Sequence, residues 1–202
     1  MDNTFVINSD FSKYEQLFLQ ENAKLNLISK NDEAQLKEKH IYDSLSIKLF
    51  EQKYGIKKGI SLLDIGCGGG FPCVPIAIEY PDITVYGIDS IRKKINAVNN
   101  INEGLNLGNL NLICDRAENL KGNKFDIITS RAVAELSVIA EYALPLLKQG
   151  GYFIAYKSKR ALTELDNAQN ILKKYNAKVK DIIEYTLPLD EVYQRNLIVT
   201  GF

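Results

Sequence analysis

The feature that most constrains the fold is a glycine-rich segment that directly follows a short apolar run. Leu62–Ile65 has the length and composition of a buried strand, and the next five positions, Gly66–Gly70, include four glycines. Glycines are needed where the backbone turns sharply and where a ligand approaches the main chain at contact distance. Residues 71–80 look like a helix after this turn. The sequence thus predicts a strand, a ligand-binding turn and a helix, with a tight turn that binds nothing as the alternative.

Apolar runs of strand length recur along the chain, and amphipathic stretches separate the first five of them. The runs are Leu62–Ile65, Ile83–Ile88, Leu110–Ile113, Phe125–Thr129, Tyr152–Tyr156, Val179–Leu187 and Leu197–Thr200. This alternation is typical of βαβ units. No strong helix separates the last two runs, which favours an antiparallel pair at the sheet edge. We therefore predict an α/β, Rossmann-like fold: a mostly parallel twisted sheet with an antiparallel C-terminal edge strand and helices on both faces.

The first quarter of the chain has a different pattern. Residues 10–50 read as helical, with Phe11, Tyr14 and Phe18 on one helix face. At 202 residues the chain is long enough for one sizeable core, and no shift in composition divides it. We predict one compact domain, with a helical extension over residues 1–55 and an α/β core over residues 56–202.

Charge is balanced over the whole chain. Lysine plus arginine and aspartate plus glutamate each number 25, so the formal net charge is zero. Proteins that capture nucleic acid by electrostatics alone are normally basic, and the balance weighs against such capture. Local basic patches remain available at Arg92–Lys94 and Lys157–Arg160, although such runs are usually solvated surface.

Three features set the expected compartment. Cys67, Cys73 and Cys114 form no CxxC pair, which fits a reducing cytosol and small packing residues better than disulfides or a zinc site. No apolar run approaches the ~18 residues that a membrane span needs. The N-terminus lacks a basic segment followed by an apolar stretch, so no secretory signal is expected. We expect a cytoplasmic protein with no bound metal and no membrane partner.

Residues around the glycines discriminate between classes of ligand. A dinucleotide fingerprint counted from Gly66 requires Gly or Ala at position 71, where Phe71 stands. Asp64, two residues before the first glycine, would repel a diphosphate but tolerate a cationic amino-acid ligand. S-adenosylmethionine carries a sulfonium and an ammonium group. The segment therefore favours S-adenosylmethionine as the cofactor over a dinucleotide.

Acidic residues follow the next two predicted strands. Asp89 ends the second strand, close to the ~20-residue spacing from the glycines at which a carboxylate holds ribose hydroxyls, and a helix N-cap is a compatible interpretation. Ala117 and Glu118 follow the third strand, at the edge where open α/β sheets bind ligands, and are expected beside the adenine. The predicted cofactor contacts from these patterns are Asp64, Gly66, Gly68, Gly70, Asp89, Ala117 and Glu118.

Two common types of nucleic-acid methyltransferase do not fit. Enzymes that methylate the exocyclic amine of adenine commonly carry Asp/Asn-Pro-Pro-Tyr/Phe after the fourth strand, where this chain has Ser130–Ala132. Cytosine C5 enzymes use a Pro-Cys nucleophile after the same strand. The Pro72-Cys73 pair lies instead at the start of the helix after the glycines. Both types are therefore disfavoured.

Six segments together carry a family resemblance. They are Asn26–Ile28, His40–Leu45, Asp64–Pro72, Asp89-Ser90, Arg116–Glu118 and Ser130–Ala134. In this order, over nearly the whole chain, they resemble the GidB (RsmG) family. The resemblance implies a class I methyltransferase fold and transfer of a methyl group from S-adenosylmethionine to N7 of a guanine in 16S ribosomal RNA of the small ribosomal subunit.

The same resemblance implies particular site residues. Cofactor contacts are implied at Gly66, Phe71, Ala117, Glu118 and Arg131. This chain departs from the family pattern in having Cys67 where Ser or Thr is expected and Cys73 where Gly is common. Both replacements are small and keep the glycine geometry.

The implied chemistry needs few catalytic groups. Guanine N7 has an in-plane lone pair and no proton, so its attack on a methyl group requires no general base. We expect alignment and charge stabilisation to suffice, with Arg116 and Arg131 as candidates for a direct role. The alternatives are a methyltransferase of a small molecule or protein on the same fold, and a non-catalytic RNA-binding assembly factor that keeps the glycine segment.

Contacts with RNA are expected from charged and aromatic side chains near the strand ends. His40 and Asp43, three residues apart on a predicted helix, share a face, and a purely structural pair is the alternative. Tyr42 and Tyr156 are available for stacking on a base. The predicted RNA contacts are His40, Asp43, Arg116, Lys157 and Arg195.

Overall fold

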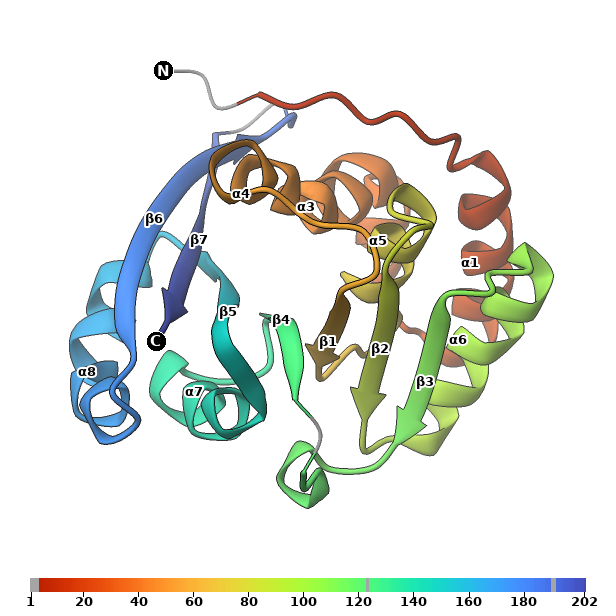
Figure 1. Ribbon diagram of the computed structural model, residues 1–202. Coiled ribbons are helices and arrows are strands. Elements are labelled where there is room, and N and C mark those ends of the chain that lie inside the picture. Colours follow the sequence, from red (N-terminus) through yellow and green to blue (C-terminus); the bar gives the residue numbers. More distant parts are fainter. Residues whose placement is uncertain (1–3, 123, 190–191) are drawn as a thin grey trace.

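A seven-stranded sheet organises the computed structural model, which describes residues 4–122, 124–189 and 192–202 (Figure 1). The strands are β1 Ser61–Ile65, β2 Thr84–Asp89, β3 Leu110–Cys114, β4 Phe125–Arg131, β5 Leu147–Ser158, β6 Lys178–Leu187 and β7 Tyr193–Gly201. Their order is β3-β2-β1-β4-β5-β7-β6, and the first five strands are parallel. The predicted Rossmann-like, mostly parallel sheet is confirmed.

The two C-terminal strands are antiparallel, as predicted, but the last strand is not the outermost one. β7 runs antiparallel between β5 and β6, which leaves β6 at the edge. Burial explains this order, because Leu197, Ile198 and Val199 are fully buried. A strand with such a continuous apolar run is covered on both faces and gains from a neighbour on each side.

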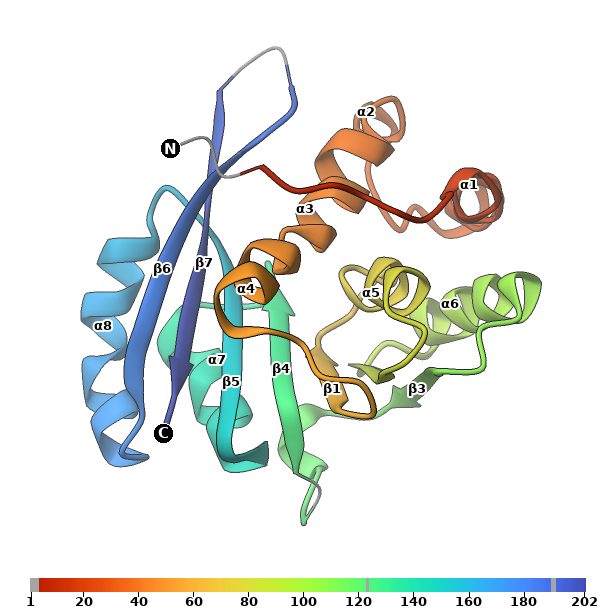
Figure 2. The same ribbon diagram turned by 45° about the horizontal axis from the view of Figure 1, so that its top comes forward.

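Helices cover both faces of the sheet (Figure 2). They are α1 Ser12–Leu25, α2 Lys30–Glu33, η1 Leu36–Ile41, α3 Tyr42–Leu45, α4 Ile47–Tyr54, α5 Cys73–Glu79, α6 Arg92–Leu105, η2 Ala117–Asn119, α7 Leu136–Ala143, η3 Leu144–Leu146 and α8 Ala161–Lys174. Of the helices from α1 to α6, all but α2 contribute to one apolar cluster, whereas α7 and α8 contribute to a second cluster on the opposite face. Within the described part of the chain, no helix combines the length and apolar character that crossing a membrane requires.

The N-terminal helices share a core with the sheet. Tyr14 and Phe18 of α1 are buried, and the ring of Phe18 lies 5.0 Å from that of Phe71, directly after the glycine segment. Gly104 on α6 leaves room for Leu17, since a Cβ at Gly104 would lie 2.8 Å from the Leu17 side chain. The predicted boundary at residue 55 therefore marks a change of element type, and the extension is packed onto the part of the core that holds the glycine segment.

Candidate functional site

The segment Gly66–Gly70 joins β1 to α5, and its main chain is fixed to β2. The N–H groups of Gly66 and Cys67 donate to the carbonyl of Ile88 at 2.8 and 3.0 Å. Gly68 has a φ of +54°, a conformation that L side chains rarely adopt. A Cβ at Gly68 would meet no neighbouring heavy atom closer than 3.9 Å, because this residue lines a cavity. Gly68 therefore combines a sharp turn with open access for a ligand.

The glycine at the end of the segment serves packing instead. A Cβ at Gly70 would lie 2.7 Å from Val74 Cγ2 and 3.2 Å from Val98 Cγ1. Because Gly70 has no Cβ, α5 and α6 can pack close to the turn. Gly70 is not among the residues that line the cavities described next, so the geometry does not support the predicted cofactor contact there.

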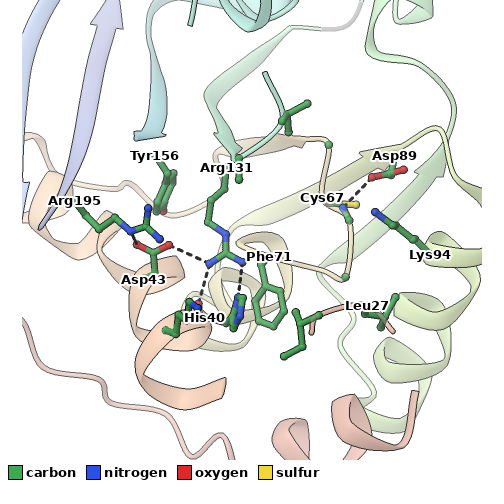
Figure 3. Close-up of a pocket in the computed structure, with 17 residues that line it drawn as sticks. Leu27, His40, Asp43, Cys67, Phe71, Asp89, Lys94, Arg131, Tyr156 and Arg195 are labelled. Carbon is green, nitrogen blue, oxygen red and sulfur yellow. Dashed lines mark hydrogen bonds and ion pairs between the residues drawn. The ribbon is translucent and has the colours of Figure 1, made fainter. Parts of the chain in front are cut away.

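Two cavities meet at the glycine segment. The first, of about 470 Å³, lies between the segment, the end of β4 and the N-terminal helices (Figure 3). Its lining includes Leu27, Lys39, His40, Asp43, Gly66, Gly68, Phe71, Asp89, Lys94, Arg131, Tyr156 and Arg195. The second, of about 330 Å³, is lined by Asp89, Arg116, Ala117 and Glu118, among others. Gly66, Asp89 and Val133 line both, so the two cavities adjoin.

Asp89 stands at the junction and holds main chain from two elements. Its Oδ2 accepts from the N–H of Gly68 at 3.0 Å, and its Oδ1 accepts from the N–H of Ile91 at 2.8 Å, just before α6. The N-cap residue of α6 is Ile91, without a side-chain cap, so the second bond supports the turn before the helix and Asp89 is not the N-cap that the sequence allowed. The carboxylate is only partly buried and lines both cavities. Its position thus suits both interpretations, ligand contact and local support.

Asp64 lies beneath the glycine segment rather than in a cavity. The residue is fully buried, and its carboxylate accepts from Thr129 Oγ1 at 3.0 Å and from the N–H of Cys73 at 3.3 Å. Burial raises the pKa of Asp64 to about 7, against the opposing effects of these bonds and the Arg131 cation. Asp64 therefore joins the turn to β4 and α5, and the geometry does not support the predicted direct contact with a cofactor.

A guanidinium forms the centre of the first cavity's polar wall. Arg131 at the end of β4 donates from Nη1 to Asp43 Oδ2 at 3.1 Å, and its Nη2 lies 3.1 Å from His40 Nδ1 (Figure 3). The guanidinium also stands 4.9 Å from the centre of the Phe71 ring. His40 and Asp43 thus share a face, as predicted, and both contact Arg131.

The contact with Arg131 fixes the state of the histidine. Arginine only donates hydrogen bonds, so His40 Nδ1 accepts and its ring proton lies on Nε2. Burial, and then the charge of Arg131, lower the pKa of His40 to about 4. The imidazole is therefore neutral at pH 7.

Sequence reasoning missed a tyrosine that completes this cluster. The Tyr185 hydroxyl on β6 donates to Asp43 Oδ1 at 2.6 Å, and Arg195 Nε lies 3.9 Å from the same oxygen. A single tyrosine on a distant edge strand carries no local signal of such a role. Lys39 also lines the first cavity and was missed, since it lies in an ordinary helical pattern. Lys94 lines it too and belongs to the basic patch Arg92–Lys94, although it was not among the predicted RNA contacts.

Three of the predicted RNA-contacting or stacking residues are occupied within the protein. Lys157 forms a buried ion pair with Glu164 at 2.6 Å and donates to the Ala134 carbonyl, which disfavours a contact with RNA phosphate. The buried Tyr156 hydroxyl donates to the Ser44 carbonyl at 2.8 Å. The ring of Tyr42 stacks on that of Phe5, with centres 4.4 Å apart. Arg116 is exposed, but it lines the second cavity.

Solved structures with a similar fold include several described as methyltransferases. The YcgJ protein from Bacillus subtilis superposes with a TM-score of 0.63 at 16% identity, covering 80% of this chain and 98% of that one. A ribosomal protein L11 methylase from Lactobacillus delbrueckii subsp. bulgaricus gives 0.59 at 14% identity, covering 78% of each chain. At such identities the likeness shows the fold alone, a class I methyltransferase fold.

Sequence comparison is more specific. A chain from Staphylococcus saprophyticus named ribosomal RNA small subunit methyltransferase G is 38% identical over 193 residues, which cover 94% of this chain and 80% of the relative. A protein of the same name from Lachnoclostridium phytofermentans is 39% identical, covering 93% and 78%. The profile of the GidB family, described as rRNA small subunit methyltransferase G, matches residues 7–197. The chain therefore belongs to the GidB family.

Proposed function

We propose that this protein transfers the methyl group of S-adenosylmethionine to N7 of a guanine in the 16S ribosomal RNA of the small subunit. One observation carries the proposal within the GidB family: two cavities adjoin at Gly66 and Asp89, and the Arg131 cluster forms the wall of the first. The second cavity would hold the adenosine of the cofactor. The first would hold the methyl-donating end of the cofactor and the guanine that accepts the methyl group. An RNA substrate of this kind places the reaction in the cytoplasm.

The residues present fit S-adenosylmethionine. Asp89 would hold the ribose, and the second cavity, with Ala117 and Glu118, would hold the adenine. The open face of Gly68 would receive the amino-acid portion. When bound, the cofactor supplies an electrophilic methyl group on a sulfonium sulfur.

The first cavity offers orientation rather than acid-base catalysis. His40 is neutral, but its Nδ1 is engaged by Arg131 and is not available as a base. The reaction does not need one, because N7 carries no proton. Asp43 balances the Arg131 charge, which keeps an unpaired cation away from a base that becomes positive as it is methylated. Catalysis then rests on aligning N7, the methyl carbon and sulfur.

Small ribosomal subunits from cells that lack this gene provide the test. Incubation with the purified protein and S-adenosylmethionine is expected to yield 7-methylguanosine at one position, detected by nuclease digestion and mass spectrometry. Transfer to a small molecule or protein and none to RNA would favour the first alternative function. Binding to subunits without transfer to any acceptor would favour an assembly factor.

A further inference from the structure

An exposed tyrosine lies next to one of the lysines that line the first cavity. Tyr193, the first residue of β7, is 41% exposed, and the ammonium group of Lys39 lies 6.0 Å from the centre of its ring. Lys39 itself lines the cavity. Figure 2 shows the neighbouring ends of β6 and β7 extending beyond the end of β5. The tyrosine thus lies at the rim of the candidate substrate site.

The register of β6 and β7 shows which way this tyrosine faces. Tyr193 pairs with Leu187, and Arg195 pairs with Tyr185, so these four residues share one face of the hairpin. Leu187 is buried in the apolar cluster of the N-terminal helices, and the Tyr185 hydroxyl reaches Asp43. The shared face is therefore the one that looks towards the first cavity.

Arg195 supplies a positive group two residues further along the strand, ~7 Å from Tyr193 along the backbone. Its Nε lies 3.9 Å from Asp43 Oδ1 and has no hydrogen-bond partner among the described residues. It lines the first cavity. The aromatic ring of Tyr193 is thus followed, further into the first cavity, by the guanidinium of Arg195, whose Nε is free to donate a hydrogen bond.

A nucleotide is the ligand that matches both groups. Its base has a flat face that stacks on an aromatic ring, and its phosphate accepts hydrogen bonds from arginine. Tyr156 and Tyr42 are not available for this task, because one is buried and the other stacks on Phe5. We propose that Tyr193 stacks on the base of a nucleotide that flanks the target guanine, with Lys39 steadying the ring and Arg195 holding the intervening phosphate.

This inference rests on the proposed function, so the wild-type protein is measured first on small subunits that lack the modification. Absence of 7-methylguanosine from that reaction would overturn the function itself. With an active wild type, Tyr193→Ala is expected to raise KM for subunits at least about fivefold, the lower end of what a lost base stack costs. The Kd for S-adenosylhomocysteine is expected to stay unchanged, since Tyr193 lines neither cavity.

Two replacements separate stacking from other contacts. Tyr193→Phe keeps the ring and is expected to retain wild-type KM, whereas Tyr193→Leu keeps apolar bulk without a π face and is expected to behave like Tyr193→Ala. Wild-type KM for Tyr193→Leu would overturn stacking in favour of a general apolar contact. Loss of function in Tyr193→Phe to the level of Tyr193→Ala would overturn it in favour of a hydroxyl contact.

The chain offers a matched control at the other end of the hairpin. Lys174 lies 5.2 Å from the centre of the Tyr175 ring and pairs with Glu141, much as Lys39 lies over Tyr193 and pairs with Asp32. Lys39→Ala is expected to raise KM for subunits, because the Tyr193 ring loses its support, and Lys174→Ala is expected to leave KM unchanged. Equal effects of both lysine variants, or wild-type kinetics in Tyr193→Ala, would overturn the proposal.

Discussion

At the scale of single residues, Gly68 is where backbone shape and ligand access coincide. Valine at this position would be strained at a φ of +54° and would project into the first cavity. Gly68→Val is therefore expected to remain folded and to weaken S-adenosylmethionine binding by at least about tenfold, measured by calorimetry. Gly59→Val is the control, since Gly59 has a φ of +76° with open space around it outside the cavities. Equal cofactor affinity in both variants would contradict the placement of the ligand.

Asp64 gives a second residue-scale prediction, concerning pH. Its pKa is raised by burial from 3.8 to about 7, so in this interval the folded protein keeps a proton that the unfolded chain releases. This group therefore lowers the free energy of unfolding as pH rises from 3.8 to about 7, and its effect levels off above that range. Asp64→Asn is expected to flatten this part of the stability profile, measured by urea unfolding at several pH values.

The same variant tests whether Asp64 touches the cofactor. An asparagine can accept from the Cys73 N–H and donate to Thr129 Oγ1, so both bonds of the native carboxylate have a replacement. With the turn supported, the Kd for S-adenosylmethionine is expected to stay within about threefold of wild type. A much larger loss in a folded Asp64→Asn protein would restore the direct contact that the sequence suggested.

At the scale of elements, Asp43 joins α3 to the ends of β4 and β6 through Arg131 and Tyr185. Removing one member of a buried ion pair leaves the other charge uncompensated. Asp43→Ala is therefore expected to lower the free energy of unfolding by about 3 kcal/mol, measured by urea denaturation. The double variant Asp43→Leu with Arg131→Met is expected to recover most of this loss, because it removes both charges.

An exposed ion pair serves as the control for Asp43→Ala. Lys58 and Asp82 pair at 2.7 Å on the surface, and such pairs contribute little to stability. Asp82→Ala is expected to lower the free energy of unfolding far less than Asp43→Ala does. If Asp43→Ala costs no more than Asp82→Ala, the buried cluster does not hold these elements together.

Elements whose signal is local were predictable from the sequence. The strand before Gly66 and the helix after it are predicted by a short apolar run, glycines and helical periodicity. The position of Asp89 at the end of β2 is predicted by its spacing from the glycines. The position of β7 inside the sheet depends on pairing with β5 and β6, which no local pattern encodes. Likewise, the burial of Lys157 depends on Glu164 from α8, and the role of Tyr185 depends on a contact with a residue 142 positions away.

At the scale of the whole molecule, zero net charge implies that RNA is held by a few placed cations. Arg195 lines the first cavity and its Nε has no hydrogen-bond partner among the described residues, whereas Lys157 is 7% exposed and paired. Arg195→Ala is therefore expected to weaken binding to small subunits and to reduce the slope of log K against log salt by about one. Lys157→Ala is expected to lower Tm, because it leaves the buried Glu164 carboxylate without its partner. The slope of log K against log salt is expected to stay unchanged.

Lys148 provides the control for this last measurement. It pairs with Asp126 at the opposite end of the sheet, near the start of β4, with its side chain 45% exposed. Lys148→Ala removes the same formal charge from the molecule as Arg195→Ala, so a field set by net charge would make the two slopes equal. A placed phosphate contact predicts a smaller slope for Arg195→Ala alone. Equal slopes in wild type and all three variants would mean that this face does not bind RNA phosphates, and a substrate other than RNA would then fit the cavity better.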